Sequence, residues 1–200
     1  AVPGMLELMR AAEAEGADAH VIACFDDTGL DAARSLLSAP VIGIGEAGAR
    51  AAGFIARRFT IVTTLSVSVP ILEDNLMRYG LAGHATVRAS EIPVLELEAD
   101  PDRTMARLSA EIAAAIAHDR AEAIVLGCAG MTSLATQLSK RHDVPVVDGV
   151  AAAITFAQAL VALGLRTTAH GLYAPPRGKA ENDGEAVLAN QNSVSKNTVL

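Results

Sequence analysis

The sequence predicts an α/β protein in which parallel strands and flanking helices form two pseudo-symmetric lobes, with an active-site cleft between the lobes. Three observations favour this fold class: strand-like and helix-like segments alternate, part of the chain repeats, and 51% of the 200 residues are hydrophobic while 20% are charged. Alternating strands and helices are typical of mostly parallel sheets covered by helices. A chain of this length and hydrophobic content can bury a sizeable core.

The spacing of apolar residues predicts the elements in order along the chain. Short aliphatic and β-branched runs predict strands, at 19–24, 40–44, 59–64, 85–89 (the weakest run), 123–128 and 144–147. Amphipathic segments predict the helices before and between them, at 5–15, 30–37, 46–56, 69–79, 103–118, 133–140 and 150–163. Gly16 ends the first helix, as glycine often does. From about Gly171 the chain is rich in Pro, Gly, Asn and Ser, which predicts a tail with little fixed structure.

Two segments of the chain repeat each other. Residues 17–24 (ADAHVIAC) align with residues 121–128 (AEAIVLGC), so that Cys24 matches Cys128. A leucine lies equally far beyond each cysteine, and a strand opening Pro-Val follows in both copies. Residues 59–100 precede the second copy and have no counterpart ahead of the first. We therefore expect the chain to be a fragment whose first lobe lacks its N-terminal strands.

The repeat also predicts the domain organisation. Residues 1–56 are expected to form the remainder of lobe 1, and residues 57–148 to form lobe 2. Residues 149–170 are expected to form a helix that returns to lobe 1, and residues 171–200 a flexible tail.

Both cysteines end predicted strands and directly precede helical segments. Ligands of open parallel sheets bind at this edge, and the positive end of a helix favours a thiolate there. A pseudo-dyad between the lobes predicts that Cys24 and Cys128 face each other. Opposed acid–base groups suit inversion at a carbon acid, because one thiolate removes a proton and the other thiol returns one to the opposite face. The structural alternatives are two buried core cysteines, which the shared motif disfavours, and a disulfide.

Four segments carry a resemblance to a known family: ACFDDTGLDAARS, RRFTIVTTLSVSVP, VLGCAGMTSL and VPVVDGVAAA, which begin at residues 23, 57, 125 and 144. They resemble the hydantoin racemase and allantoin racemase branch of the aspartate/glutamate racemase superfamily, from residue 1 to about Lys179. The resemblance implies a cofactor-independent racemase that uses two cysteines, acts on a small-molecule cyclic ureide and self-associates into homo-oligomers. It also implies that Thr63 and Thr64 hydrogen-bond the substrate, although β-branched residues are equally ordinary in strands.

The residues after each cysteine are further candidates for substrate binding. Backbone N–H groups at 25–27 and 129–131 are placed to stabilise the enolate oxygen that forms when a hydantoin C5 loses its proton. Amino-acid racemases of the superfamily have Asn-Thr and Thr-Glu after their cysteines, whereas this chain has Phe-Asp and Ala-Gly. The difference predicts a substrate with no free amino-acid head group. The substrate-binding candidates are Phe25, Asp26, Thr63, Thr64, Ala129 and Gly130.

Composition argues against several other kinds of protein. A net charge of −7 with 3% aromatic residues argues against a nucleic-acid surface, and no apolar stretch predicts a membrane span. Two cysteines and no apparent secretory leader predict a cytoplasmic setting. The histidines and cysteines lack metal-ligand spacing and no lysine resembles a Schiff-base lysine, so we expect neither a metal nor another cofactor.

Some signals and functions stay open at this stage. Residues 43–48 (GIGEAG) match G-x-G-x-x-G, but the acidic residue expected about twenty positions later is missing, which favours a tight turn over a dinucleotide site. Asp26 and Asp27 are expected either to cap the following helix or to line the cleft, and Asp148 has the same two roles open. The alternative functions are a maleate isomerase, an arylmalonate decarboxylase, which the paired cysteines disfavour, and a non-catalytic binding module.

Overall fold

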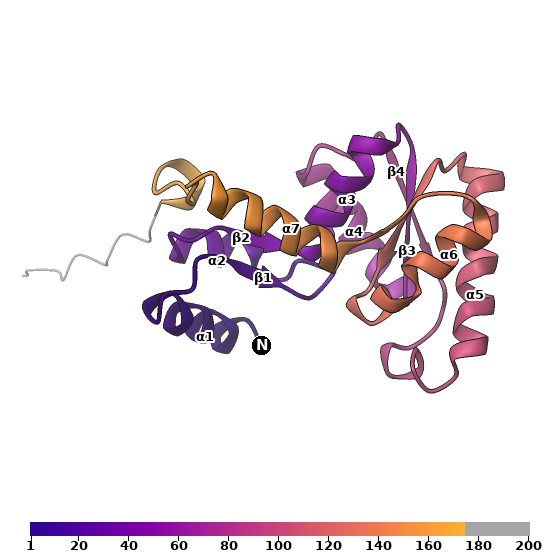
Figure 1. Ribbon diagram of the computed structural model, residues 1–200, viewed down its shortest axis with the longest axis horizontal. Coiled ribbons are helices and arrows are strands. Elements are labelled where there is room, and N and C mark those ends of the chain that lie inside the picture. The colour runs from indigo at the N-terminus through magenta and orange to yellow at the C-terminus, as the bar shows by residue number, and fades with distance from the viewer. Residues whose placement is uncertain (175–200) are drawn as a thin grey trace, which may run out of the picture.

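A computed structural model describes residues 1–174 of the chain. A two-stranded and a four-stranded sheet lie end to end, each covered by helices (Figure 1). All the strand pairs in these residues are parallel, so the predicted α/β fold with parallel sheets is confirmed. No helix within residues 1–174 has the length and apolar character needed to cross a membrane.

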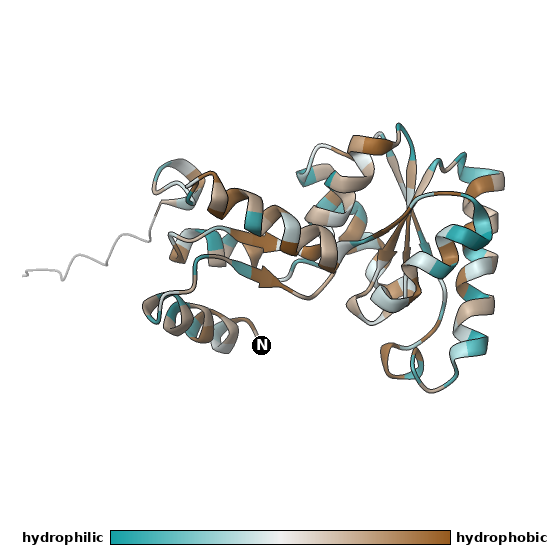
Figure 2. Ribbon diagram, in the orientation of Figure 1, coloured by the Kyte–Doolittle hydropathy of each residue, from teal (hydrophilic) through white to brown (hydrophobic). Residues whose placement is uncertain are grey.

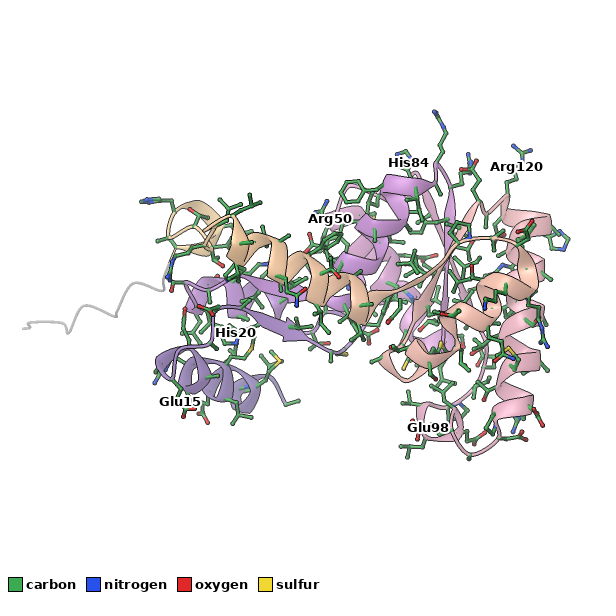
Figure 3. All side chains as sticks on the ribbon, in the orientation of Figure 1. Glu15, His20, Arg50, His84, Glu98 and Arg120 are labelled. Carbon is green, nitrogen blue, oxygen red and sulfur yellow. The ribbon has the colours of Figure 1, made fainter. Side chains whose placement is uncertain are left out.

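The small lobe contains β1 (His20–Ile22), which pairs with β2 (Val41–Gly43). Helices α1 (Val2–Ala14) and α2 (Leu30–Leu36) pack beside this sheet. Its buried apolar residues form one cluster, made up of Met9, Ile22, Leu30, Ala33, Leu37 and Val41. His20, the first residue of β1, lies next to α1 (Figure 3), and its Nε2 is buried with no hydrogen-bond partner in the described residues.

The large lobe contains β3 (Phe59–Thr63), β4 (Ala85–Ala89), β5 (Ala123–Gly127) and β6 (Val146–Asp148), in the order β4-β3-β5-β6. Every residue of β3 and β5 is buried, as expected for central strands covered on both faces. Alternate residues of these strands point to opposite faces because the side-chain period of a strand is two.

Helices cover both faces of the large sheet. On one face, α5 (Pro101–Ala114) and α6 (Ala135–His142) pack on a cluster that includes Val62, Ile124 and Leu126. On the other face, α4 (Val69–Arg78) and α3 (Ile44–Ile55) pack on a cluster that includes Ile61 and Val125. Figure 2 shows the apolar strands at the centre of this lobe and polar surfaces on α5 and α6. The apolar residues on both faces of the strands therefore each have helices to pack against.

Helices α3 and α7 (Gly149–Ala162) pack against each other and connect the lobes. Helix α3 follows β2 of the small sheet but packs on β5 of the large sheet, whereas α7 follows β6 and packs along β1 and β2 (Figure 1). Each of the two helices thus covers the sheet of the other lobe. The division of the chain into lobes at residue 56 stays a prediction. Helix α3 precedes this point in the chain but packs on the sheet that follows it.

The structure differs from the predicted elements at several ends. The long helix α5 ends in a π-helical turn (Ala115–Asp119), and a 3-10 helix (Ala129–Leu134) joins Cys128 to α6. Shorter 3-10 helices lie at Ser66–Ser68 and Val94–Glu96. A further one, Gly171–Tyr173, falls at the start of the predicted tail. The rest of that tail, 175–200, lies outside the described residues.

Candidate active site

Cys24 and Cys128 lie close enough for the charge of Cys24 to act on the Cys128 thiol. Cys24 lies just beyond the carboxyl end of β1 and is exposed, and Cys128 directly follows β5 and is half-buried. Burial raises the pKa of the Cys128 thiol, a backbone N–H at Gly130 opposes the rise, and the negative charges of Cys24 and Asp26 add to it. The two cysteines are therefore close enough to influence each other electrostatically, as acid–base partners at one substrate carbon must be.

The same backbone turn follows both cysteines. The N–H of Asp27 donates to the carbonyl of Cys24 at 3.0 Å, and the N–H of Met131 donates to the carbonyl of Cys128 at 3.1 Å. Residues 24–29, the Cys24 loop, then lead into α2, and residues 128–134, the Cys128 loop, continue as a 3-10 helix. The repeat in the sequence thus corresponds to a repeat in backbone geometry, and it places the cysteines at matching positions.

The residues after Cys24 serve two different purposes. The Phe25 ring is only 5% exposed and packs in the core beside Gly48 and Gly149, so its side chain does not face the site. The N–H groups of Phe25 and Asp26 have no hydrogen-bond acceptor among residues 1–174. The Asp26 carboxyl is half-buried, and burial raises its pKa. Phe25 can therefore contact a ligand through its backbone, whereas Asp26 offers both backbone and carboxyl.

The residues after Cys128 lie beside its thiol. Gly130 is exposed, and a Cβ added to it would lie 3.8 Å from the Cys128 Sγ and 3.0 Å from Leu97 Cδ1. Ala129 is half-buried and packs against the core. Two features thus distinguish Gly130: it donates an N–H toward the sulfur, and it lacks a side chain that would crowd Leu97.

The threonine pair ends β3, the strand next to β5. The Thr63 hydroxyl donates to the carbonyl of Gly127 at 3.3 Å, and the residue is 1% exposed. The carbonyl of Thr64 accepts from the N–H of Ile92 and from the Ser90 hydroxyl, whereas the Thr64 hydroxyl makes no hydrogen bond within the described chain. Thr64 is therefore the member of the pair whose side chain is available to a ligand.

Asp27 holds the Cys24 loop to α3, a role that the sequence did not reveal. Its buried carboxylate accepts the N–H groups of Gly45 at 3.0 Å and Glu46 at 2.7 Å, and the hydroxyl of Tyr79 at 2.6 Å. It therefore caps α3 and not the following helix, α2, whose N-cap is Gly29. Burial raises the pKa of Asp27 to about 6 although three donors surround it.

The G-x-G-x-x-G segment accommodates this carboxylate. A Cβ on Gly43 would lie 2.1 Å from Asp27 Oδ1, and a Cβ on Gly45 would lie 2.3 Å from the Phe25 carbonyl oxygen. Gly48 faces Val125 and the Cα of Gly149, where α3 and α7 meet. A dinucleotide would bring its pyrophosphate to this helix N-terminus, which the protein's own carboxylate occupies. The paired glycines at a helix start were the sequence signal for a buried acceptor.

Asp148 has the same role at α7 that Asp27 has at α3, because each aspartate caps a helix that covers the sheet of the other lobe. Its carboxylate accepts the N–H groups of Val150 at 2.9 Å and Ala151 at 3.3 Å, so the cap of α7 that was one of its two expected roles is confirmed. It also accepts the hydroxyl of Thr132, in the Cys128 loop, at 3.0 Å. An aspartate thus connects each cysteine loop to the N-terminus of a helix: Asp27 connects the Cys24 loop to α3, and Asp148 connects the Cys128 loop to α7.

Comparison with known proteins gives consistent results. Residues 1–157 match a family model described as Asp/Glu/Hydantoin racemase. A hydantoin racemase from Rhizobium meliloti is 54% identical over 180 residues, covering 90% of this chain and 75% of the relative. A hydantoin racemase from a Pseudomonas species is 41% identical over 179 residues, covering 89% and 72%. The solved structure of allantoin racemase from Klebsiella pneumoniae matches with a TM-score of 0.84 at 45% identity, covering 88% of this chain and 73% of that one.

Proposed function

The chain belongs to the Asp/Glu/hydantoin racemase family and is an isomerase of that family, and we propose that it racemises a 5-substituted hydantoin with Cys24 and Cys128 as its acid–base residues. The family that four sequence segments predicted is thereby confirmed. Allantoin is itself a hydantoin with a ureido group at C5, so the relatives named for hydantoin and for allantoin share one ring chemistry. We therefore assign the hydantoin ring, and not a particular C5 substituent, as the recognised part of the substrate.

One observation carries the proposal: two cysteines follow matching strands and begin matching turns, and the charge of Cys24 acts on the Cys128 thiol. A single-base enzyme needs only one such residue. Racemisation needs a proton acceptor on one face of the carbon and a donor on the other, and two lobes related by a pseudo-dyad supply both.

The proposed reaction moves two protons and leaves no net change in the protein's charge. The thiolate of one cysteine takes the proton from C5, and the electron pair of the broken C–H bond delocalises onto the C4 oxygen as an enolate. The thiol of the other cysteine then gives its proton to the opposite face of C5. The cysteines end with their protonation states exchanged. Because burial raises the pKa of Cys128, we assign the thiol form to Cys128 in the resting state.

Groups of the protein backbone support this step. The unpartnered N–H groups of Phe25 and Asp26 are suited to bind the enolate oxygen, and donors of this kind contribute about 3 kcal/mol in other enzymes. The free hydroxyl of Thr64 suits a ring N–H or carbonyl, whereas the Thr63 hydroxyl already has a partner. Both proton transfers use groups of the chain, so the proposal requires no cofactor.

The test is proton NMR of L- and D-5-benzylhydantoin and of allantoin in D₂O, with a protein-free control because these rings racemise slowly on their own. We expect the C5 proton to exchange with deuterium as optical rotation is lost, both faster than in the control. Undiminished racemisation in both Cys24→Ser and Cys128→Ser would refute the two-cysteine mechanism.

The alternatives give different outcomes in the same set of assays. Turnover of maleate without hydantoin exchange indicates a maleate isomerase, and carbon dioxide release from an arylmalonate by the Cys24→Ser variant indicates a decarboxylase that uses Cys128. Thiols that react with iodoacetamide no faster than a free cysteine, together with no turnover, indicate a binding module. The homo-oligomer and the cytoplasmic setting stay predictions, which light scattering and cell fractionation would test.

A further inference from the structure

Helix α4 of the large lobe contacts the Cys24 loop through polar side chains. The Asn75 Nδ2 donates to the carbonyl of Asp26 at 2.8 Å, and the Tyr79 hydroxyl donates to Asp27 Oδ2 at 2.6 Å. Residues four apart on a helix lie on the same face, so both donors reach the loop from one side of α4. Their two acceptors lie two and three residues after Cys24. The helix therefore holds the segment on which the position of the cysteine depends.

These side chains are themselves held in place. Asn75 is 5% exposed, and its Oδ1 accepts from Arg78 Nη1 at 3.2 Å, which fixes which end of the amide faces the loop. Arg78 also forms an ion pair with Asp31 on α2. Burial and the neighbouring Asp27 raise the pKa of Tyr79, so its hydroxyl stays protonated and remains a donor. Both contacts thus join groups of fixed polarity.

If the two lobes needed only to pack together, buried polar contacts between them would be less favourable than apolar contacts. A buried amide must keep its partners, because a lost one leaves an unsatisfied polar group. Apolar side chains bury area without such a requirement, but they do not fix the loop at particular atoms. The Cys24 loop has little regular structure of its own, since Asp27 adopts a positive φ of 51° and residues 23 and 24 are exposed. Its conformation therefore depends on what contacts it.

From this geometry we propose that Asn75 and Tyr79 are positioning residues, which hold the Cys24 loop to the lobe that carries Cys128. The proposal rests on the proposed function in one respect, that Cys24 is a catalytic acid–base residue. The contacts connect α4 to a loop of the other lobe, so they fix the position of one thiol relative to the other. Misplacement of a reacting group by about 1 Å costs about 10²-fold in rate.

Within the described residues, the Cys128 loop makes no hydrogen bond to α4 and instead contacts α7, which packs along the small sheet. It forms a 3-10 helix, and the Thr132 hydroxyl bonds to Asp148 at the start of α7. Loss of the α4 contacts should therefore loosen one cysteine loop and leave the other unchanged. A general loss of stability would affect both loops.

The experiment compares Tyr79→Phe with Tyr173→Phe, the only tyrosines in the chain. Both substitutions remove a hydroxyl that bonds to an aspartate, but Tyr173 bonds to Asp31 on α2, outside residues 24–29. We expect Tyr79→Phe to lower kcat for 5-benzylhydantoin by about 10- to 100-fold with little change in KM, as misplacement of one reacting group predicts. Tyr173→Phe should match the unsubstituted protein. Asn75→Ala is a second variant for the same contact face.

Hydrogen exchange followed by mass spectrometry reports on the loops without any need for turnover. We expect Tyr79→Phe to speed amide exchange in peptides that cover residues 24–29, but not in peptides that cover 128–134. Unchanged exchange in the Cys24 loop, or equal acceleration in both loops, overturns the proposal. Folded protein that keeps its full kcat in both Tyr79→Phe and Asn75→Ala also overturns it. If the unsubstituted protein racemises no hydantoin, the proposed function fails, and the exchange measurement still decides whether α4 holds the loop.

Discussion

The loop after Cys24 and the loop after Cys128 begin with the same turn, but different parts of the molecule hold them. The Cys24 loop is bound from outside, by α4 through Asn75 and Tyr79 and by the α3 N-terminus through Asp27. The Cys128 loop is stabilised by its own 3-10 helix and by one bond from Thr132 to Asp148. The comparison teaches that a pseudo-symmetric pair of cysteines does not require pseudo-symmetric support. Five predictions test how far this difference extends, and the tyrosine comparison above is one of them.

Substitution of either cysteine should have the largest effect, and the two variants should lose activity in the same way but toward opposite enantiomers. Cys24→Ser and Cys128→Ser should each lower racemisation by about 10²- to 10⁴-fold, the usual contribution of a general acid or base. Each variant keeps one thiol, so each should still exchange the C5 proton of one enantiomer, and the two variants should favour opposite enantiomers. Proton NMR in D₂O on separate L and D substrates measures this. Exchange of the same enantiomer by both variants would contradict opposed thiols.

Alanine substitutions of Gly45 on α3 and Gly149 on α7 are expected to have the next largest effect. A Cβ at Gly45 would lie 2.3 Å from the Phe25 carbonyl oxygen, and a Cβ at Gly149 would lie 2.4 Å from that of Ile44. Since backbone cannot move aside easily, each glycine-to-alanine substitution should lower the free energy of unfolding by about 1–3 kcal/mol. Gly45→Ala should also lower kcat more than Gly149→Ala, because Gly45 meets the backbone of the Cys24 loop at the Phe25 carbonyl, whereas Gly149 meets that loop at the Phe25 ring.

The control for both is Gly53→Ala, on the exposed side of α3, where the nearest atom to an added Cβ lies 3.8 Å away. This substitution should raise the free energy of unfolding by up to about 1 kcal/mol, because alanine loses less backbone entropy in a helix. Urea unfolding measures all three variants. Equal stabilities for Gly45→Ala, Gly149→Ala and Gly53→Ala would show that the helices do not approach as closely as described.

The third prediction concerns pH and the Asp27 carboxyl of the Cys24 loop. Its pKa rises from 3.8 to about 6 on folding, so the folded state holds this proton more tightly than the unfolded state. The contribution of Asp27 to stability is therefore greatest below about pH 4, falls as pH rises, and is lost above about pH 6. The loss is about 3 kcal/mol, since one pKa unit corresponds to about 1.4 kcal/mol.

Asp27→Asn isolates this contribution, because asparagine tolerates the positive φ and still accepts an N–H but does not titrate in this range. The unfolding free energy of the unsubstituted protein minus that of Asp27→Asn should decrease between pH 4 and pH 7 in urea titrations. A difference that is constant or that increases with pH would contradict the raised pKa.

The smallest expected effect is at the Cys128 loop. Thr132→Val removes the hydroxyl, which lies within hydrogen-bond distance of both Asp148 and the Ala129 carbonyl, but leaves the two N–H donors that the carboxylate also accepts. We expect a loss of about 1 kcal/mol in the free energy of unfolding, the usual value of one hydrogen bond. Faster amide exchange should be confined to residues 128–134. Thr155→Val is the control, because its exposed hydroxyl bonds only within α7; an equal loss there would contradict a special role for Thr132.

Much of the fold followed from local apolar patterns. The buried strands β3 and β5 are uninterrupted apolar or threonine runs, and both cysteines stand where such runs end. The repeat predicted that the cysteines occupy matching positions, because similar sequences form similar strand–turn units. The pattern was less informative at element ends, where the 3-10 helix after Cys128 and the π-helical end of α5 depend on packing with other elements.

The support of the site was not predictable in the same way. Asp27 caps a helix that begins seventeen residues later in the chain, and Tyr79 reaches it from another lobe, so neither contact leaves a local signal. Phe25 was expected beside the substrate because it follows Cys24, whereas its large apolar ring gains more from burial between α3 and α7. Thr63 and Thr64 look alike in sequence, and only the register between β3 and β5 gives Thr63 an acceptor.

Because α3 and α7 each cover the sheet of the other lobe, the two lobes depend on each other during folding. The part of the small sheet that α7 covers stays uncovered until residues 149–162 have been synthesised, since α7 packs along β1 and β2. During synthesis the first lobe therefore waits for nearly the whole of the second before its apolar face is buried. Contacts so distant in sequence slow the search for the native state and favour a single cooperative transition over stepwise formation of two lobes.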